Sequence, residues 1–193
     1  MSRFSLIVTD TSPLITLALA DALDALLRAR MPVKVPDAVY VEATRVRTAS
    51  GASRIVEWLN ANLDQVQIVP TEVGVDQQRR LEEGRPTRGL GEIASIEVLD
   101  RHLGSSPEST ALLLFEDTDL LRRRAVIDDR VGLISTGDLL RELQSAGLIQ
   151  SADQVLDDAA REGRNVERLR TAASDPEVRV ALSAQLRSAR DED

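Results

Sequence analysis

The chain lacks cysteine altogether and has a single histidine, His102, among its 193 residues. Without cysteine, the protein has no disulfide, no thiol nucleophile and no cysteine zinc site, and the cytoplasm is the expected compartment. One histidine is too few for a histidine-rich zinc site and disfavours a Ser-His-Asp triad. If the protein is an enzyme, carboxylates must therefore carry the chemistry, alone or through a metal.

Aromatic residues, basic surface and long apolar runs are also scarce. Aromatics make up 2% of the chain, too few for a groove in which successive bases stack, so Trp58 and Tyr40 are interpreted as core or interface residues. No run of about 20 apolar residues and no signal peptide is evident, so no membrane span is expected. The net charge of −8 excludes a broad basic surface, although a local arginine rim could still bind RNA phosphates.

What the chain does have is an alternation of short apolar runs with amphipathic stretches, which predicts an α/β fold. We expect a three-layer α/β/α arrangement with a central parallel sheet, because strands that alternate with helices form parallel sheets covered on both faces. The predicted strands occupy residues 4–9, 32–35, 65–69, 111–115 and 131–134. The predicted helices occupy residues 13–29 (with Ser12 as cap and Pro13 in the first turn), 37–47, 52–61, 74–83, 89–102, 118–126 and 136–146.

The pattern changes after residue 150. Residues 151–162 and 176–188 are charge-rich and amphipathic, which predicts two further helices, and no strand candidate follows them. We therefore expect two parts, an α/β domain over residues 1–150 and a helical C-terminal appendage over residues 151–193.

Four acidic residues stand at positions where an α/β fold could gather them. Asp10 follows the first predicted strand and Asp117 follows the fourth, while Glu42 and Glu92 lie on predicted helices. The carboxyl ends of parallel strands face the functional crevice of open α/β sheets. Carboxylates collected there would form a hard, oxygen-rich site of the kind that Mg²⁺ or Mn²⁺ prefers.

Four segments surround these acids, and they read DTSPLI at 10–15, VPDAVYVE at 35–42, GLGEIASI at 89–96 and FEDTDL at 115–120. In order and in spacing, over about residues 4–149, they resemble the motifs of PIN domains. Each motif is weak alone, but four in order form a coherent match. The later Ser135-Thr136 and the AGLI segment at 146–149 resemble a PIN-like subgroup.

The resemblance implies a Mg²⁺- or Mn²⁺-dependent ribonuclease, such as the toxin of a VapC-type toxin–antitoxin pair, with residues 1–150 as the nuclease domain. It implies an acidic catalytic quartet of Asp10, Glu42, Glu92 and Asp117, and a metal site of Asp10, Glu92, Asp117 and the accessory Asp119. Substrate contacts are expected from Thr11, Ser12 and Arg122. The partners implied are RNA, an antitoxin protein and a second copy of the chain.

Each residue also has an ordinary structural interpretation. Asp10 could cap the helix that begins near Pro13, and Glu42 could be an exposed helix glutamate. Glu92 could be an acid in the first turn of a helix, where the helix dipole stabilises negative charge. Asp117 and Asp119 could be loop or cap residues, and Arg122-Arg123-Arg124 a solvated helix face. Glu97 and Glu116 are expected to be solvated, and His102 to contact carbonyls at a helix end. Arg85 and Arg88, around a glycine loop, are further candidates for phosphate contacts.

Two other functions remain open at this point. The first is a PIN-like domain that binds RNA or protein without cleaving, which the acidic composition permits, as does Phe115 at a position where many PIN domains have Thr or Ser. The second is an unrelated acid-dependent phosphotransfer protein. A dehalogenase-like phosphatase needs a second aspartate two residues after the first, where this chain has Ser12, and a receiver domain needs a lysine at a late strand end, whereas Lys34, the only lysine, lies early.

Overall fold

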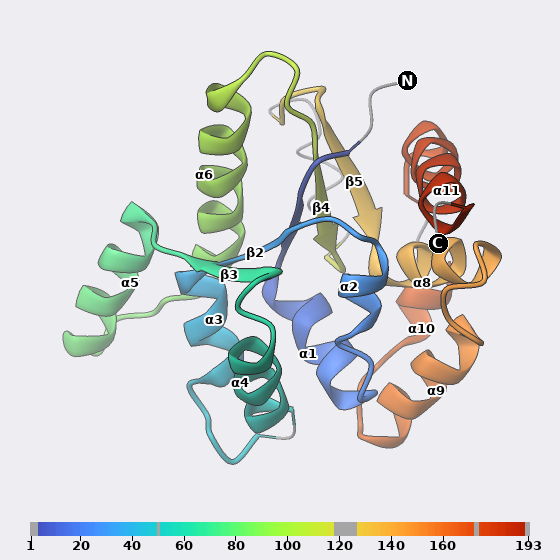
Figure 1. The fold of residues 1–193 in the computed structure, drawn as a ribbon. Coiled ribbons are helices and arrows are strands. Elements are labelled where there is room, and N and C mark those ends of the chain that lie inside the picture. The colour runs from blue at the N-terminus through green and yellow to red at the C-terminus, as the bar shows by residue number, and fades with distance from the viewer. Residues whose placement is uncertain (1–3, 50, 118–126, 172–173, 192–193) are drawn as a thin grey trace.

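The computed structural model describes residues 4–49, 51–117, 127–171 and 174–191. At its centre is a five-stranded, all-parallel sheet in the order β3-β2-β1-β4-β5 (Figure 1). The strands are β1 (Ile7–Thr9), β2 (Val33–Pro36), β3 (Val66–Val69), β4 (Ala111–Phe115) and β5 (Val131–Ser135). All five predicted strands are present, and helices flank the sheet, so the predicted α/β/α architecture is confirmed.

Side chains that alternate along the strands form the two apolar layers of the sheet. Leu112 and Leu114 of β4 belong to the larger cluster, whereas Leu113 and Phe115 belong to the smaller one. The smaller cluster is covered by helix α6 (Leu90–Ser105), which packs on β1, β2 and β4. Continuous apolar runs such as ALLLF are typical of strands buried on both faces, as these are.

The remaining helices lie along the chain in the order expected. They are α1 (Thr11–Leu19), α2 (Ala25–Arg28), α3 (Asp37–Thr44), α4 (Ala52–Ala61), α5 (Glu72–Glu82), α8 (Thr136–Ser145), α9 (Ala152–Arg161), α10 (Glu167–Thr171) and α11 (Pro176–Asp191). The predicted single helix over residues 13–29 is wrong, because the chain turns between α1 and α2 at Asp21, whose φ is 54°. The predicted helix over 118–126 lies outside the described residues.

The helices after residue 150 share the core of the sheet. Leu156 of α9 and Leu182 and Leu186 of α11 are fully buried members of the larger apolar cluster. Helix α9 packs on α1 and α8, and α11 packs on α8 and β5 (Figure 1). The side-chain amide of Gln185 also hydrogen-bonds to both the backbone N–H and the carbonyl of Phe4.

A buried carboxylate ties this region to the sheet. Asp138 of α8 is 1% exposed and accepts hydrogen bonds from the hydroxyl of Ser135 and the backbone N–H of Ser174. Its carboxylate also pairs with Arg141 at 2.8 Å. Burial alone would raise the pKa of Asp138, but the hydrogen bonds and the charge of Arg179 hold that pKa below its ordinary value. No helix in the described ranges is long and apolar enough to cross a membrane.

Candidate active site

Asp10 lies at the carboxyl edge of the sheet, at the end of the central strand β1. It directly follows β1, and its backbone N–H donates to the carbonyl of Leu114 in β4 at 3.1 Å. Asp10 is the residue that precedes α1, but its side chain makes no capping hydrogen bond. The helix begins at Thr11, so the prediction that Ser12 caps it is wrong, whereas Pro13 lies in the first turn as predicted.

The Asp10 carboxyl is surrounded by other acids. Burial raises the pKa of Asp10 from 3.8 to about 6, opposed by the backbone N–H of Thr11. The negative charges of Glu42, Glu92 and Glu116 raise the pKa further. A buried carboxyl whose pKa is raised and that has other acids nearby is common at functional sites.

Three of the four predicted acids line one small cavity. Its walls are Asp10, Glu92 and Asp117, with the apolar side chains of Leu113 and Phe115 and the hydroxyl-bearing Ser95. The cavity has a volume of about 10 Å³, which is roughly the space that one water molecule needs. Asp10 is contributed by the end of β1, Asp117 by the chain after β4, and Glu92 by the first turn of α6.

Glu42 reaches the same region from α3 and is held by two neighbours. Its carboxylate accepts a hydrogen bond from the Thr11 hydroxyl at 2.8 Å and one from the backbone N–H of Gly91 at 3.4 Å. A Cβ added at Gly91 would stand 2.7 Å from Oε2 of Glu42 and 3.0 Å from Oγ1 of Thr11. Glycine at position 91 therefore lets the start of α6 approach α1 and α3 closely enough for its backbone to donate to Glu42.

The donor set suits a hard divalent cation. Among the described residues, which do not include Asp119, no group of three or more His, Asp or Glu side chains is arranged so that it could hold a metal ion. Mg²⁺, however, commonly binds through one or two carboxylates and completes its shell with waters and substrate phosphates. The carboxylates of Asp10, Glu92 and Asp117 around one cavity match that need in chemical type and in charge.

Glu116 and Arg164 form a contact that the sequence did not reveal. The Glu116 side chain is only 8% exposed and pairs with the Arg164 guanidinium at 2.8 Å. Its other oxygen accepts a hydrogen bond from the Thr136 hydroxyl. Arg164 also donates to the hydroxyl of Thr16 and the carbonyl of Ser12 in α1. The expectation that Glu116 is solvated is therefore wrong, and residues after 150 help to position the edge that carries Asp10 and Asp117.

Other candidates lie elsewhere or outside the described residues. Glu97 is not solvated, because it accepts hydrogen bonds from the backbone N–H groups of Glu72 and Val73 at the start of α5. The ring of His102 lies 3.0 Å from the Ser5 hydroxyl at the opposite end of β1, and burial and then the charge of Lys34 lower its pKa. Asp119 and the three arginines at 122–124, including Arg122, lie outside the described residues.

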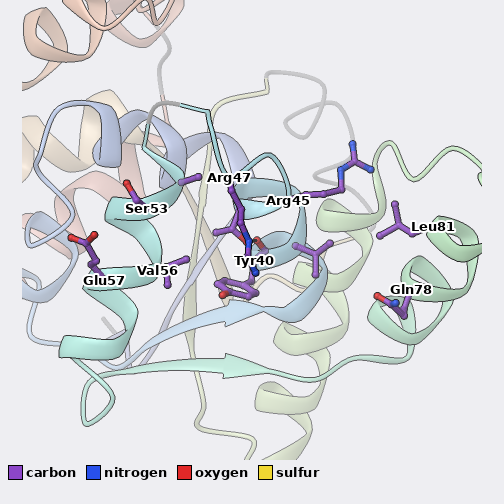
Figure 2. Close-up of a pocket in the computed structure, with 11 residues that line it drawn as sticks. Tyr40, Arg45, Arg47, Ser53, Val56, Glu57, Gln78 and Leu81 are labelled. Atoms are coloured by element: carbon purple, nitrogen blue, oxygen red, sulfur yellow. Dashed lines mark hydrogen bonds between the residues drawn. The ribbon is translucent and has the colours of Figure 1, made fainter.

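A larger cavity opens between α3, α4 and α5. It has a volume of about 640 Å³ (Figure 2), in the range of small-molecule sites. Trp58 is a core residue as expected, 8% exposed and hydrogen-bonded to Asp24, but Tyr40 is half-buried and lines this cavity. The lining residues come from the three helices and the turn after α3, and they are Tyr40, Val41, Thr44, Arg45, Arg47, Ala52, Ser53, Val56, Glu57, Gln78 and Leu81.

Comparison with known proteins places the chain in a family. A family model described as a PIN domain matches residues 6–172. The match covers the whole sheet and continues through α9 and α10. Comparisons with curated proteins and with solved structures gave no significant match.

Proposed function

Because the chain belongs to the PIN-domain family, whose members are generally nucleases, we propose that it is a Mg²⁺- or Mn²⁺-dependent endoribonuclease. The reaction is hydrolysis of RNA phosphodiester bonds through Asp10, Glu42, Glu92 and Asp117. The observation that carries this proposal is the environment of Asp10, where burial and three neighbouring acids raise the pKa of its carboxyl to about 6. Such crowding of carboxylates is costly unless a cation is bound between them.

Asp10, Glu92 and Asp117 are the residues that would hold the cation, because all three face one cavity. A divalent cation supplies a deprotonated water at neutral pH and stabilises negative charge on the phosphate. Asp119 is proposed as an accessory ligand on the basis of its motif.

The neighbouring residues of the chain keep the acids in place. Thr11 donates to Glu42 and thereby orients one carboxylate beside the cluster. Arg164 pairs with Glu116 and Thr136 donates to it, so that the side chain of Glu116 is held by partners of its own. Ser12 and Arg122 are proposed to contact the substrate.

The wider biological role follows from the family likeness. We propose that the protein acts in the cytoplasm as the toxin of a toxin–antitoxin pair and is restrained by an antitoxin protein. We also propose a homodimer, in which the helices after residue 150 complete or shield the interface. A neighbouring gene that encodes a small DNA-binding protein would support the toxin assignment, and its absence would count against it.

One observation favours a second candidate, a PIN-like domain that binds RNA without cleaving it. Phe115 is 1% exposed and lines the acidic cavity, where a hydroxyl would offer a hydrogen bond. The two candidates are separated by incubating purified protein with single-stranded and structured RNA in Mg²⁺, in Mn²⁺ and in EDTA. Cleavage in either ion that stops in EDTA supports the ribonuclease, whereas RNA binding without cleavage in both ions supports the second candidate.

A further inference from the structure

The cavity between α3, α4 and α5 carries two arginines with no partner in the described part of the chain. Arg45 and Arg47 follow α3, are exposed and line the cavity, and neither guanidinium group forms a hydrogen bond or ion pair with the residues described. Arg141 and Arg164, by contrast, pair with acids at 2.8 Å. Two unpaired guanidinium groups at one opening, in a chain of net charge −8, favour an anionic ligand.

The remaining lining residues supply surfaces of another kind. Tyr40 presents an aromatic side chain, and Val56 and Leu81 are apolar (Figure 2). Gln78 and Ser53 carry polar groups, and Glu57 adds one carboxylate. Aromatic and apolar side chains that lie together with polar groups are typical of small-molecule pockets. One tyrosine cannot form a groove for a run of bases, but it can stack against one base.

The cavity lies beside the acidic cluster because α3 serves both. Glu42 points from α3 toward Thr11 and Gly91, and Arg45 follows it by three residues. Residues three apart on a helix are neighbours, with Cβ atoms about 5–6 Å apart. An RNA strand whose scissile phosphate lies at the acidic cluster could therefore place an adjacent nucleotide in the cavity.

We propose that this cavity binds one nucleotide of single-stranded RNA next to the cleavage site, with its base against Tyr40 and its phosphate on Arg45 and Arg47. The assignment of the ligand as RNA rests on the proposed ribonuclease function. A nucleotide fits the lining better than an acidic protein segment does, because the cavity combines a single aromatic ring with two guanidinium groups in a concave space of limited size.

The test measures RNA binding separately from cleavage. A short fluorescent single-stranded RNA is titrated with full-length Asp10→Asn protein in EDTA, and its anisotropy is recorded at several salt concentrations. Adding Arg45→Gln and Arg47→Gln should weaken binding about tenfold or more and lower the slope of log K against log salt by about 0.7 for each lost phosphate contact. Adding Tyr40→Leu instead should weaken binding at least about fivefold and leave the slope unchanged.

The matched control removes two charges elsewhere. Arg28→Gln with Arg168→Gln changes two exposed arginines on α2 and α10 that do not line the cavity, and binding should change less than about twofold. Thermal unfolding should be the same in the control and test pairs, because all four side chains are exposed.

The outcomes distinguish this site from the proposed function. If the wild type cleaves RNA but the variant with both Arg45→Gln and Arg47→Gln binds RNA as tightly as the control, the nucleotide site is wrong and the ribonuclease stands. If the wild type cleaves nothing but this double variant loses RNA binding, the site stands without the activity. If the double variant keeps RNA binding and instead loses binding of an Asp- and Glu-rich peptide, the cavity binds a protein partner and the nucleotide proposal is overturned.

Discussion

Replacing Gly91 by alanine tests how the acidic cluster is assembled. Gly91 and Gly104 are each the second residue from an end of α6. Alanine is favoured over glycine inside helices by up to about 1 kcal/mol, so either substitution would stabilise an isolated helix. The surroundings differ, because a Cβ at Gly104 would meet nothing within 4 Å, whereas one at Gly91 would lie 2.7 Å from the Glu42 carboxylate.

The magnitude follows from the contacts at position 91. The Glu42 carboxylate is the end of a flexible side chain and can move away, but it then loses the 2.8 Å hydrogen bond from Thr11, which contributes about 1 kcal/mol. This loss offsets the helix gain, so Gly91→Ala should leave the free energy of unfolding unchanged or lower it by about 1 kcal/mol. Gly104→Ala should raise it by up to about 1 kcal/mol, which is about 2–4 °C in Tm for a chain of this size.

The assay compares thermal unfolding and RNA cleavage for the two variants and the wild type. Gly104→Ala should cleave RNA as the wild type does, whereas Gly91→Ala should cleave at least about tenfold more slowly, because Glu42 is displaced. The reasoning is refuted if Gly91→Ala raises Tm as much as Gly104→Ala and cleaves at the wild-type rate. Glu42 would then be unconstrained by Gly91.

Three further predictions concern charge and assembly. The raised pKa of Asp10 means that the folded protein binds this proton more tightly than the unfolded chain does, so the ionised carboxylate opposes folding. In EDTA, the contribution of Asp10 to stability should therefore fall as pH rises from about 4 through about 6. Asp10→Asn should be more stable than wild type by up to about 3 kcal/mol at pH 7 but nearly equal to it near pH 4. A difference that is the same at both pH values would contradict this. Arg164→Gln should lower the free energy of unfolding by about 2–3 kcal/mol, because it leaves the 8%-exposed Glu116 without its ion pair. Arg161→Gln, which removes an exposed pair with Asp158, should lower it by less than about 1 kcal/mol. Equal losses for the two variants in denaturant titrations would count against the positioning role of Arg164. Light scattering at tens of micromolar should show a dimer, and a monomer would remove the proposed homodimer.

The strands were predictable because their signal is local. The run ALLLF predicted β4 with the same bounds that the structure has, and the other strands agree within three residues. Acids that follow two of these runs could be expected at one sheet edge, because all parallel strands point the same way. The placement of Asp10 and Asp117 around one cavity follows from that rule and from the adjacency of β1 and β4.

The features that were missed depend on contacts between distant residues or on backbone geometry with no sequence marker. The turn between α1 and α2 places Asp21 at positive φ, where neither glycine nor proline marks the break. Arg164 and Glu116 are 48 residues apart and lie in different loops, so no local pattern links them. The role of Gly91 similarly appears only when α1, α3 and α6 are packed together.

The most direct test of the central claim measures Mn²⁺ binding and RNA cleavage on the same proteins. Mn²⁺ is titrated into wild type, Asp10→Asn and Asp117→Asn while bound ion is followed by electron paramagnetic resonance, and cleavage is recorded over the same concentrations. We expect half-maximal cleavage at the Mn²⁺ concentration that half-saturates the wild type, and in both variants weaker Mn²⁺ binding and cleavage reduced about 10²-fold or more. Wild-type Mn²⁺ affinity in both variants, or cleavage by the wild type that persists in EDTA, would contradict a catalytic cation at this acidic cluster.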